Sequence, residues 1–449
     1  MTPDTIIGII FFVGMMVMIF CGIPVFISML VASFGGFIAL SFGGLNMTLT
    51  QFTDAIFYLG ANYNYAVLPL FMLVGALAGA TGIAEGAFKA MHKWFGRVKG
   101  GLLYTVIASN AVFGACSGSS VAGNIVFGKL AIPELKKAKY DESYSMGCIT
   151  AAGALSTLIP PSMGILMFCM VAPSPIVFHG QNVTLSVGTA LVSGIIPGIA
   201  TAIALGITVR ILGVTKKGSI PEPSGEKIPF VEKLSSLKLI VPILLLFGLI
   251  IGGTVLGWFT ATVGGAIGAV AICIYALIKK IPLKHILHCI WDAAMMEGGI
   301  FPIIVGGQLF SRFVALSGLA DFLSNAIISL NAPVFLVFLL VMLLYIVCGC
   351  VMDIVSVIII TVPVVFPILC SLGYSPYAVI VALCFMTEIA GLTPPIGMNV
   401  FATANALRVN PTEIFKGVVP YFICELLMVV LIALFPSMVT FLPGLIGKI

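Results

Sequence analysis

Charged residues are scarce in this chain. Only 8% of its 449 residues are Asp, Glu, Lys or Arg, whereas 60% are hydrophobic and the mean hydropathy is +1.22. A soluble domain of this length needs far more polar residues to cover its surface. The composition therefore excludes a soluble protein and predicts an all-α polytopic membrane protein.

Signatures of catalysis and of nucleotide binding are also missing. The four histidines (His92, His179, His285 and His288) fall in predicted loops or interfaces, so a serine of the "SGSS" stretch would have no base. No complete phosphate-binding loop, GxxxxGK followed by Ser or Thr, is present. We therefore expect neither an enzyme nor a nucleotide-driven pump, which leaves an ion gradient as the source of energy.

One polar stretch, residues 214–238, divides the chain into halves that resemble each other. Pro160 and Pro161 in "LIPPS" match Pro394 and Pro395 in "LTPPI" at an offset of 234 residues (394 − 160 = 234). The same offset aligns three further pairs: Pro133 with Pro367, Leu135 with Leu369, and Tyr140 with Tyr374. These matches predict a duplication, with a first repeat over residues 1–213, a cytoplasmic linker over 214–238 and a second repeat over 239–449.

Corresponding loops of the two halves differ in charge. The first-half loops "HKWFGRVK" (residues 92–99) and "KKAK" (136–139) are basic, whereas "LSNAIISLNAP" and "CSLGYSP" in the second half contain no Lys or Arg. Conversely, "KKIPLKH" (279–285) corresponds to the uncharged "SFGGLNMTLTQ". Because basic loops stay in the cytoplasm, corresponding loops should lie on opposite sides of the membrane. The repeat is therefore predicted to be inverted, with both termini outside.

Two apolar runs are predicted to be re-entrant helical hairpins. Residues 102–135 lie between two basic loops, so this run has to enter and leave from the cytoplasm, with its tip at "ACSGSSVAGN". By the offset, residues 334–369 form a hairpin from the outside, with its tip at "CGCVMDIV". Each hairpin is followed by a transmembrane helix that prolines break, over residues 146–175 and 376–407.

The hairpin tips and the helix breaks are the candidate functional site. Irregular backbone at membrane depth is tolerated only where it is buried in protein or lines a polar cavity. Carbonyl and hydroxyl oxygens suit Na⁺, the only metal we expect, and free N–H groups at half-helix N-termini favour an anion. The alternative for the serine-rich tip is that small residues merely permit close packing.

The candidate ligands follow from these positions. In the first half the predicted Na⁺ ligands are Ser117, Gly118, Ser119, Ser120, Asn124 and Thr157. In the second half they are Gly349, Cys350, Asp353, Gly391 and Thr393. The predicted anion contacts are Ser120, Pro160, Pro161, Ser162, Pro394, Pro395 and Asn399. A structural role for the Asp353 carboxylate remains open if it is hydrogen-bonded.

Two further charged residues have open roles. Glu388 precedes the second break and is a candidate for the same cation network or for proton coupling. Arg312 in "LFSRFVAL" either faces an anionic substrate or extends its side chain toward a membrane interface.

Several blocks together resemble the large membrane subunit of the TRAP (tripartite ATP-independent periplasmic) transporters. They are "GACSGSSVAGN", "IPELKKAKYD", "GALSTLIPPS", "MDIVSVIIITVPVVFPI" and "TEIAGLTPPIGMNVF". The similarity extends over nearly the whole chain and includes "GWFTATVGGAIGAVAICIYAL" (residues 257–277), which is similar to the family's "GIFTPTEAAA" region.

The resemblance implies a sodium-coupled importer of small organic anions, such as C4-dicarboxylates or sialic acid, in the bacterial inner membrane. It implies two partners, a small membrane subunit of about four helices (Q) and a periplasmic substrate-binding protein (P), and no nucleic acid. It also implies a fold like that of the ion-transporter superfamily, in which an elevator motion carries the hairpins and broken helices. No cofactor is expected besides Na⁺ as coupling ion.

Two departures from the family pattern affect the substrate. The acidic residue often found in the family's "LAGE" stretch is absent at Ala76, and "TPTE" is replaced by "TATV" at residues 260–263. Two alternatives remain: a stand-alone sodium/carboxylate symporter of the same architecture, and a membrane scaffold in which the breaks are packing devices. The substrate, the Na⁺ stoichiometry, the resting state and the oligomeric state are not determined by the sequence.

Overall fold

Apolar helices make up almost all of the fold. In a computed structural model, the described residues are 2–178, 180–216, 218–222, 228–329 and 333–446. Seven described helices are long and apolar enough to cross a membrane, and up to nine spans result if each of two bent helix pairs is one span. The predicted all-α polytopic class is confirmed, apart from one short β-hairpin.

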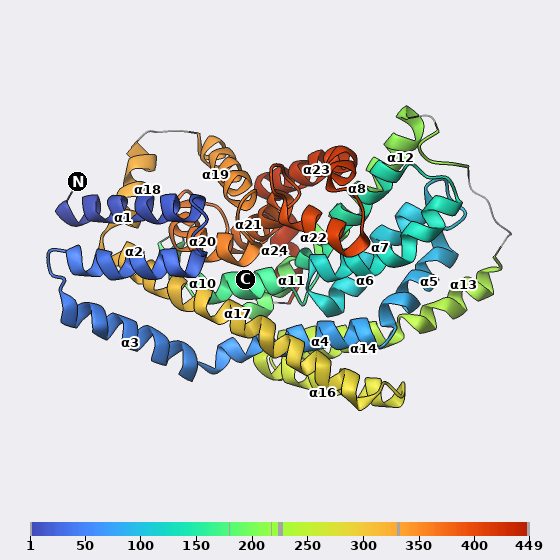
Figure 1. The fold of residues 1–449 in the computed structure, drawn as a ribbon, viewed down its shortest axis with the longest axis horizontal. Helices are drawn as coiled ribbons and strands as arrows, with labels where there is room; N and C mark the ends of the chain where they lie inside the picture. The colour runs from blue at the N-terminus through green and yellow to red at the C-terminus, as the bar shows by residue number, and fades with distance from the viewer. Residues whose placement is uncertain (1, 179, 217, 223–227, 330–332, 447–449) are drawn as a thin grey trace.

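The elements of the first half follow in chain order (Figure 1). They are α1 (Pro3–Phe20), α2 (Val25–Ala39), α3 (Leu45–Ala61), the 3₁₀ turn η1 (Tyr63–Ala66), α4 (Val67–Ala80), α5 (Ile83–Phe95), α6 (Gly101–Ser117), α7 (Ser120–Lys137), α8 (Glu142–Ala152), α9 (Leu155–Leu158), α10 (Met163–Val171), β1 (Ile176–Phe178), β2 (Gln181–Val183), α11 (Val187–Ser193) and α12 (Ile195–Thr215). The strands β1 and β2 are antiparallel, with Ile176 opposite Val183.

The second half begins within the predicted linker. Its elements are α13 (Phe230–Ser236), η2 (Leu237–Leu239), α14 (Val241–Phe247), the π turn η3 (Gly248–Gly252), α15 (Gly253–Val255), α16 (Ala261–Ile278), α17 (Leu283–Leu316), α18 (Leu319–Ser329), α19 (Val334–Gly349), α20 (Ile354–Ser371), α21 (Pro376–Ala390), α22 (Met398–Leu407), α23 (Pro411–Leu434) and α24 (Ser437–Leu445). Residues 217 and 223–227 of the predicted linker lie outside the described part of the chain.

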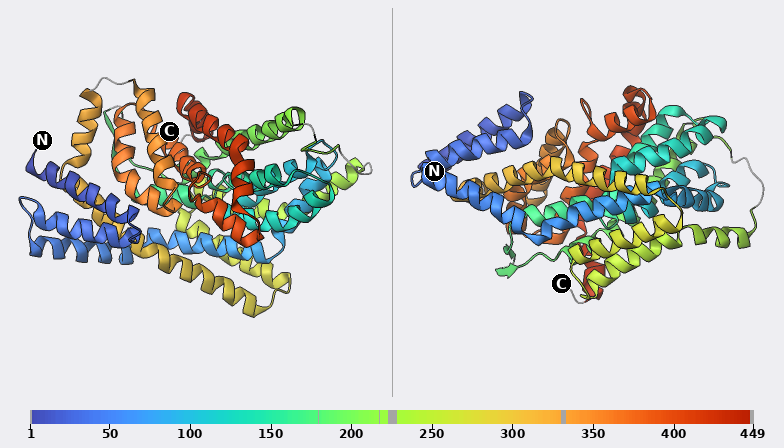
Figure 2. Two further views of the ribbon diagram at one scale, coloured as in Figure 1. Left: turned by 45° about the horizontal axis from the view of Figure 1, so that its top comes forward. Right: turned by 60° about the horizontal axis from the view of Figure 1, so that its bottom comes forward.

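The helices form two groups that lie against each other. The long helices α3, α4, α16 and α17 follow one edge of the molecule, and α17 contacts α2, α3 and α4 (Figures 1 and 2). The interrupted helices lie together in the other group, where α20 contacts α10 and α21, and α6 contacts α7 and α9. Helices α4, α17 and α10 connect the two groups. The interrupted helices therefore face the edge formed by the continuous ones.

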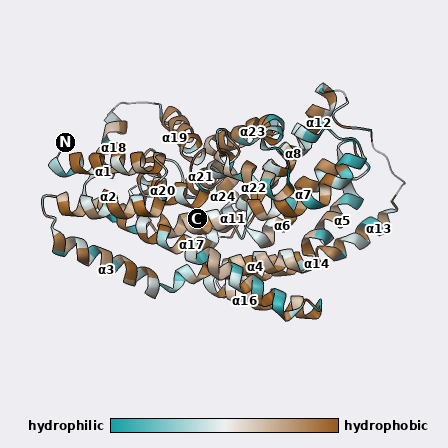
Figure 3. Cartoon of the chain, in the orientation of Figure 1, coloured by the Kyte–Doolittle hydropathy of each residue, from teal (hydrophilic) through white to brown (hydrophobic). Residues whose placement is uncertain are grey.

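The polar loops of the first half gather at one end of the molecule. Lys99 Nζ lies 2.6 Å from Glu222 Oε1, and the backbone N–H of Asp141 donates to the Ser219 carbonyl at 2.9 Å. The first basic loop and the residue at the start of α8, just after the second, therefore contact the 214–238 segment. Hydrophilic residues gather near the ends of α5, α7 and α13 (Figure 3). We call this the linker end. Away from the linker end, the backbone N–H of Ser186, which precedes α11, donates to the hydroxyl of Tyr377 at the start of α21, at 3.2 Å.

The offset of 234 residues reappears in the element bounds. Helices α7 and α20 begin at residues 120 and 354 (354 − 120 = 234) and end at 137 and 371 (371 − 137 = 234). Helices α8 and α21 begin at 142 and 376 (376 − 142 = 234). Ser119 and Asp353, again 234 apart, are the N-caps of α7 and α20. The second helix of each hairpin therefore begins for the same reason. The side chain of the cap residue accepts a hydrogen bond from a backbone N–H of the first turn that would otherwise have no partner.

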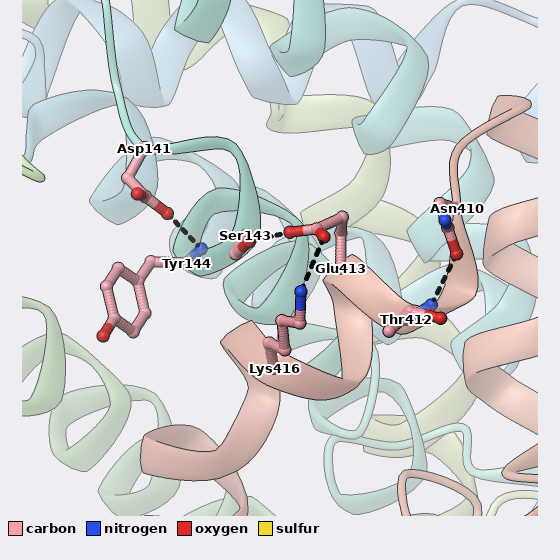
Figure 4. A network of polar contacts seen from close by, with 7 residues as sticks. All are labelled: Asp141, Ser143, Tyr144, Asn410, Thr412, Glu413 and Lys416. Atoms are coloured by element: carbon pink, nitrogen blue, oxygen red, sulfur yellow. Dashed lines mark hydrogen bonds and ion pairs between the residues drawn. The ribbon is translucent and has the colours of Figure 1, made fainter.

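Helices α8 and α23 make an unusually close contact near the linker end. Asp141 caps α8 by accepting from the Tyr144 amide at 2.9 Å, and Asn410 caps α23 in the same way (Figure 4). Between the two helices, the Ser143 hydroxyl donates to Glu413. One turn further, Gly147 and Gly417 let the backbones touch, since a Cβ built on Gly417 would lie 1.7 Å from the Ser143 carbonyl oxygen.

We predict that Gly417→Ala destabilises the protein. The added methyl group would force the two helices apart, which costs about 1–3 kcal/mol. Gly14→Ala in α1 is the matched control, because a Cβ there has nothing within 4 Å. Thermal unfolding of the purified protein should show a lower midpoint for Gly417→Ala and an unchanged or higher one for Gly14→Ala. Equal midpoints for the two variants would contradict the close helix contact.

Candidate functional site

A cavity of about 400 Å³ lies between the first hairpin tip and the long helices. Five predicted Na⁺ ligands line it: Ser117, Gly118, Ser119, Ser120 and Thr157. From the second half, Ile354 and Val355 at the start of α20 and Glu388 of α21 line it as well. The cavity therefore joins residues that are more than 200 positions apart, and we call it the central cavity.

The first hairpin tip is built around Gly118 and Ser119. Gly118 has φ +58°, a left-handed conformation that ends α6 and that glycine adopts without strain. Ser119 then caps α7 by accepting from the Ala122 amide at 3.4 Å. The tip packs on the first break, because a Cβ on Gly118 would lie 2.4 Å from the Pro161 carbonyl oxygen. The hairpin and the broken helix thus touch backbone to backbone.

Buried oxygen atoms gather behind this tip. Within the described residues, Asn110 Oδ1, Ser117 Oγ, Asn124 Oδ1 and Ser156 Oγ are buried without a hydrogen-bond partner. Asn124 donates from Nδ2 to the Thr150 carbonyl at 3.2 Å, and its Oδ1 faces Gly153, where a Cβ would lie 2.3 Å away. Buried oxygens normally find partners. Oxygen atoms without donors are suited to a hard cation such as Na⁺.

The first break sits between α9 and α10. The chain bends by 48° between residues 142–158 and 163–171, and Ser162 caps α10 by accepting from the Ile165 amide at 3.2 Å. Pro160, Pro161 and Ser162 are buried but do not line the central cavity. The Ser162 hydroxyl therefore serves as the cap of α10. Pro161 contributes to the site through its backbone carbonyl, against which Gly118 packs.

The second hairpin tip lies between α19 and α20. Asp353 caps α20 by accepting from the Ser356 amide at 3.1 Å and from the Ser356 hydroxyl. Cys350 Sγ donates to the Pro394 carbonyl at 3.1 Å, so this tip also touches its own proline pair. Gly349 packs closely on Ala390. None of Gly349, Cys350 and Asp353 lines the central cavity.

The second break connects to the central cavity through Glu388. The buried carboxylate of Glu388 accepts from the side-chain Nδ2 of Asn399 at 2.7 Å. The backbone N–H of Asn399 donates to the Gly391 carbonyl at 3.1 Å. The Thr393 hydroxyl donates to the Ile389 carbonyl at 3.2 Å. Asn399 therefore positions the Glu388 carboxylate, and the bonds of Gly391 and Thr393 close the end of α21. None of these three residues lines the central cavity.

The two proline pairs differ in exposure. Pro160 and Pro161 are buried, whereas Pro394 and Pro395 are exposed. The first break is thus closed inside the protein, and the second reaches the molecular surface. This asymmetry is absent from the sequence, in which the two motifs look equivalent.

The opposite wall of the central cavity was not predictable from the sequence. This wall comes from α4 and α17, and its residues are Leu68, Met72, Gly75, Ala76, Asp292, Met296 and Ile300. Apolar residues on long helices look the same whether they face lipid or a cavity, so hydropathy alone does not separate them. Ala76, singled out only as a departure from a family pattern, is one of the lining residues.

A second cavity, of about 910 Å³, lies further along α17. Arg312, Gln308 and Ser311 of α17 line it together with Tyr65 and the segment after α10. Gln308 Nε2 donates to the Tyr65 hydroxyl at 3.2 Å, which connects α17 with η1. We call it the outer cavity because it lies at the end away from the linker.

Comparisons with known proteins agree over almost the whole chain. The family described as "Tripartite ATP-independent periplasmic transporter, DctM component" matches residues 12–438. The sialic acid TRAP transporter large permease protein SiaM of Vibrio cholerae is 25% identical over 98% of both chains. The C4-dicarboxylate TRAP transporter large permease protein DctM of Rhodobacter capsulatus is 26% identical over 86% of this chain and 88% of its own.

One solved structure has a similar fold. The crystal structure of the Alcanivorax borkumensis YdaH transporter aligns with 97% of this chain and 98% of its own, with a TM-score of 0.62 at 16% sequence identity. At this identity the match concerns the fold alone. It covers the interrupted helices as well as the long ones.

We predict that Gly118→Ala disrupts the first hairpin tip. Alanine at φ +58° costs about 1–2 kcal/mol, and its Cβ would also collide with the Pro161 carbonyl. Gly164→Ala is the control on the same cavity, because its Cβ would meet only ordinary contacts, the nearest at 3.8 Å. Thermal unfolding should show a lower midpoint for Gly118→Ala alone, and a wild-type midpoint for this variant would contradict the tip geometry.

Proposed function

We propose that this chain, which belongs to the DctM component family of the tripartite ATP-independent periplasmic (TRAP) transporters, imports a small organic anion by sodium-coupled secondary transport. Family membership makes it a multi-pass membrane permease and not an enzyme. The substrate is a carboxylate or an acidic sugar, classes that the names of the Rhodobacter capsulatus and Vibrio cholerae relatives support.

The observation behind this proposal is the central cavity. It is lined by a serine-rich tip, which includes the unpartnered Ser117 Oγ, and by the Glu388 carboxylate, and irregular backbone at membrane depth needs a polar function. Na⁺ binds to oxygens of the first tip and of the residues beside it, namely Ser117 to Ser120, Asn124 and Thr157. The substrate anion enters the same cavity, near Ser120 and the proline pairs.

A second Na⁺ binds at the second tip and the second break. Its ligands are Asp353, Gly349, Cys350, Gly391 and Thr393. Support comes from the 234-residue offset, which places Asp353 at the position of Ser119, and from the contact of both tips with their proline pairs. The cap bonds made by Asp353 leave oxygen lone pairs for a cation, because a carboxylate has about four acceptor sites.

The transport movement is an elevator motion of an inverted repeat. The hairpins and the broken helices move together, and the long helices form the scaffold beside them. This division follows the two helix groups and their boundary at the cavities. The linker end is cytoplasmic by the positive-inside rule, so both termini and the outer cavity face the periplasm of a bacterium.

Two partner proteins complete the transporter, as the word tripartite in the family description supports. A periplasmic binding protein (P) delivers the substrate, and a small membrane subunit (Q) of about four helices packs against this chain in the inner membrane. Uptake that needs no binding protein would instead identify a stand-alone sodium/carboxylate symporter.

The test is uptake by proteoliposomes that contain this chain and the Q subunit. We expect accumulation of substrate only when an inward Na⁺ gradient and loaded binding protein are both present. The assay compares Na⁺ with K⁺ gradients, each with and without the binding protein. Equal uptake without Na⁺ would refute sodium coupling, and equal uptake without the binding protein would refute the tripartite system.

We predict that Asp353→Asn raises the Na⁺ concentration for half-maximal uptake about tenfold, which corresponds to ~1.4 kcal/mol. Asparagine still caps a helix, so α20 keeps its start while the carboxylate charge is lost. Asp54→Asn removes an equal charge from the exposed face of α3 and serves as the control. An unchanged Na⁺ dependence of Asp353→Asn, with folding intact, would leave Asp353 only its capping role.

A further inference from the structure

The outer cavity contains a cation without an anionic partner. Arg312 lines it half-buried, and the structure gives it one hydrogen bond, from Nη1 to Gln51 Oε1 at 3.4 Å. Within the described part of the chain, no carboxylate lies within ion-pair distance of Arg312. A guanidinium is a rigid fork of donors that matches a carboxylate, and here that fork is largely free.

The lining of the outer cavity is suited to a ligand that carries one negative charge and several hydroxyl groups. Among the described residues that line it, only Arg312 and Asp321 are charged, and their opposite charges leave no net positive charge to balance a dianion. Uncharged polar side chains surround them, including Asn62, Asn64, Ser174, Thr260, Thr262 and Ser311. A volume of about 910 Å³ is within the range of small-molecule sites.

The outer cavity is separate from the central cavity. Helix α17 lines both cavities, but with different residues. Met296 and Ile300 line the central cavity, whereas residues between Gln308 and Ala315 line the outer cavity. From Met296 to Arg312 the helix rises roughly 24 Å. The outer cavity also contacts the end of α10, where Met170 O accepts from Gln308 Nε2 at 3.5 Å. It therefore spans the boundary between the long and the interrupted helices.

From these observations, we propose that the outer cavity is a receiving site for the transported anion, in which Arg312 binds the carboxylate of a hydroxylated monocarboxylate, the chemistry of an acidic sugar. The proposal rests on the proposed transport function, because it places the site on the path to the central cavity. Asn, Ser and Thr side chains bind the hydroxyl groups, and Asp321 repels a second negative charge.

Protection of a cysteine beside Arg312 tests the site directly. The protein carries Ser311→Cys with Cys21→Ser and Cys169→Ser, which remove the exposed native thiol and the native thiol that lines the outer cavity, and is reacted with a maleimide in nanodiscs. Gluconate is the probe, sorbitol its uncharged counterpart and succinate a dianion. We expect gluconate to slow the labelling and sorbitol and succinate to leave it unchanged. No protection by gluconate, or equal protection by succinate, would overturn the proposal.

The Arg312→Gln variant identifies the cationic anchor. Loss of a charge-assisted hydrogen bond should raise the gluconate concentration for half-protection roughly 10- to 100-fold. Arg210→Gln removes an equal charge from the exposed face of α12 and should leave protection unchanged. Unchanged protection in a folded Arg312→Gln protein would overturn the role of Arg312.

Gln51→Glu separates anion binding from a structural role. A carboxylate at position 51 would pair with Arg312 and compete with the ligand, so we expect protection to fall although the arginine remains. If Arg312 served only to hold α17 against α3 through Gln51, the new ion pair would strengthen that contact and leave protection unchanged. That result would overturn the proposal.

Failure of the site and failure of the function give different results. The labelling assay needs only binding, whereas the proteoliposome assay needs Na⁺-driven uptake. Lost protection together with normal uptake overturns the receiving site alone. Absent uptake in a protein that shows protection overturns the transport function, and with it the position of the site on a transport path.

Discussion

A peptide group that is left open inside a membrane has no water to bind, and the arrangement of this protein follows from that constraint. The two hairpin tips and the two proline breaks interrupt apolar helices, and each of them is covered by another interruption or by a cap. Gly118 covers the Pro161 carbonyl, and Cys350 donates to the Pro394 carbonyl. Ser119 and Asp353 close the open amides of α7 and α20. Each hairpin tip therefore contacts the proline pair of its own half, and the central cavity lies at the first tip, where the start of α20 and Glu388 also reach it.

The two halves contribute unequally to that place. The first half supplies the hairpin tip and the oxygens without partners behind it, whereas the second half supplies two carboxylates, Asp292 and Glu388, and Asn399 donates to the second of them. The exposure of the proline pairs shows the same inequality, since only the second pair reaches the surface. The two halves, which the sequence predicts to be repeats, therefore contribute different groups to the cavity and differ in the exposure of their proline pairs.

The sequence predicted local breaks better than it predicted their surroundings. The interruptions at Gly118, at Pro160 and before Asp353 were predictable because glycine, proline and capping residues act on their own turn of backbone. The wall made by α4 and α17 was not, since Met72 or Met296 on a long apolar helix gives no sign of facing a cavity.

The same limit applies to Arg312 and to the capping carboxylate. Hydropathy does not distinguish a cavity arginine from one that extends toward an interface, and only the packing of α3, α17 and α18 does. The bonds of Asp353 to Ser356 are local and agree with the structural alternative that the sequence left open. The Na⁺ ligands remain predictions, because coordination depends on distances between segments that a sequence does not contain.

The contact of Gly147 with Gly417 has a mechanical consequence. Where two helices touch through backbone atoms, no side chain lies between them that could change rotamer to accommodate a shift. Helices α8 and α23 therefore form a rigidly packed pair, and α8 continues through the 48° bend into α10. In the proposed elevator motion, a displacement of the broken helix would therefore carry α23 with it.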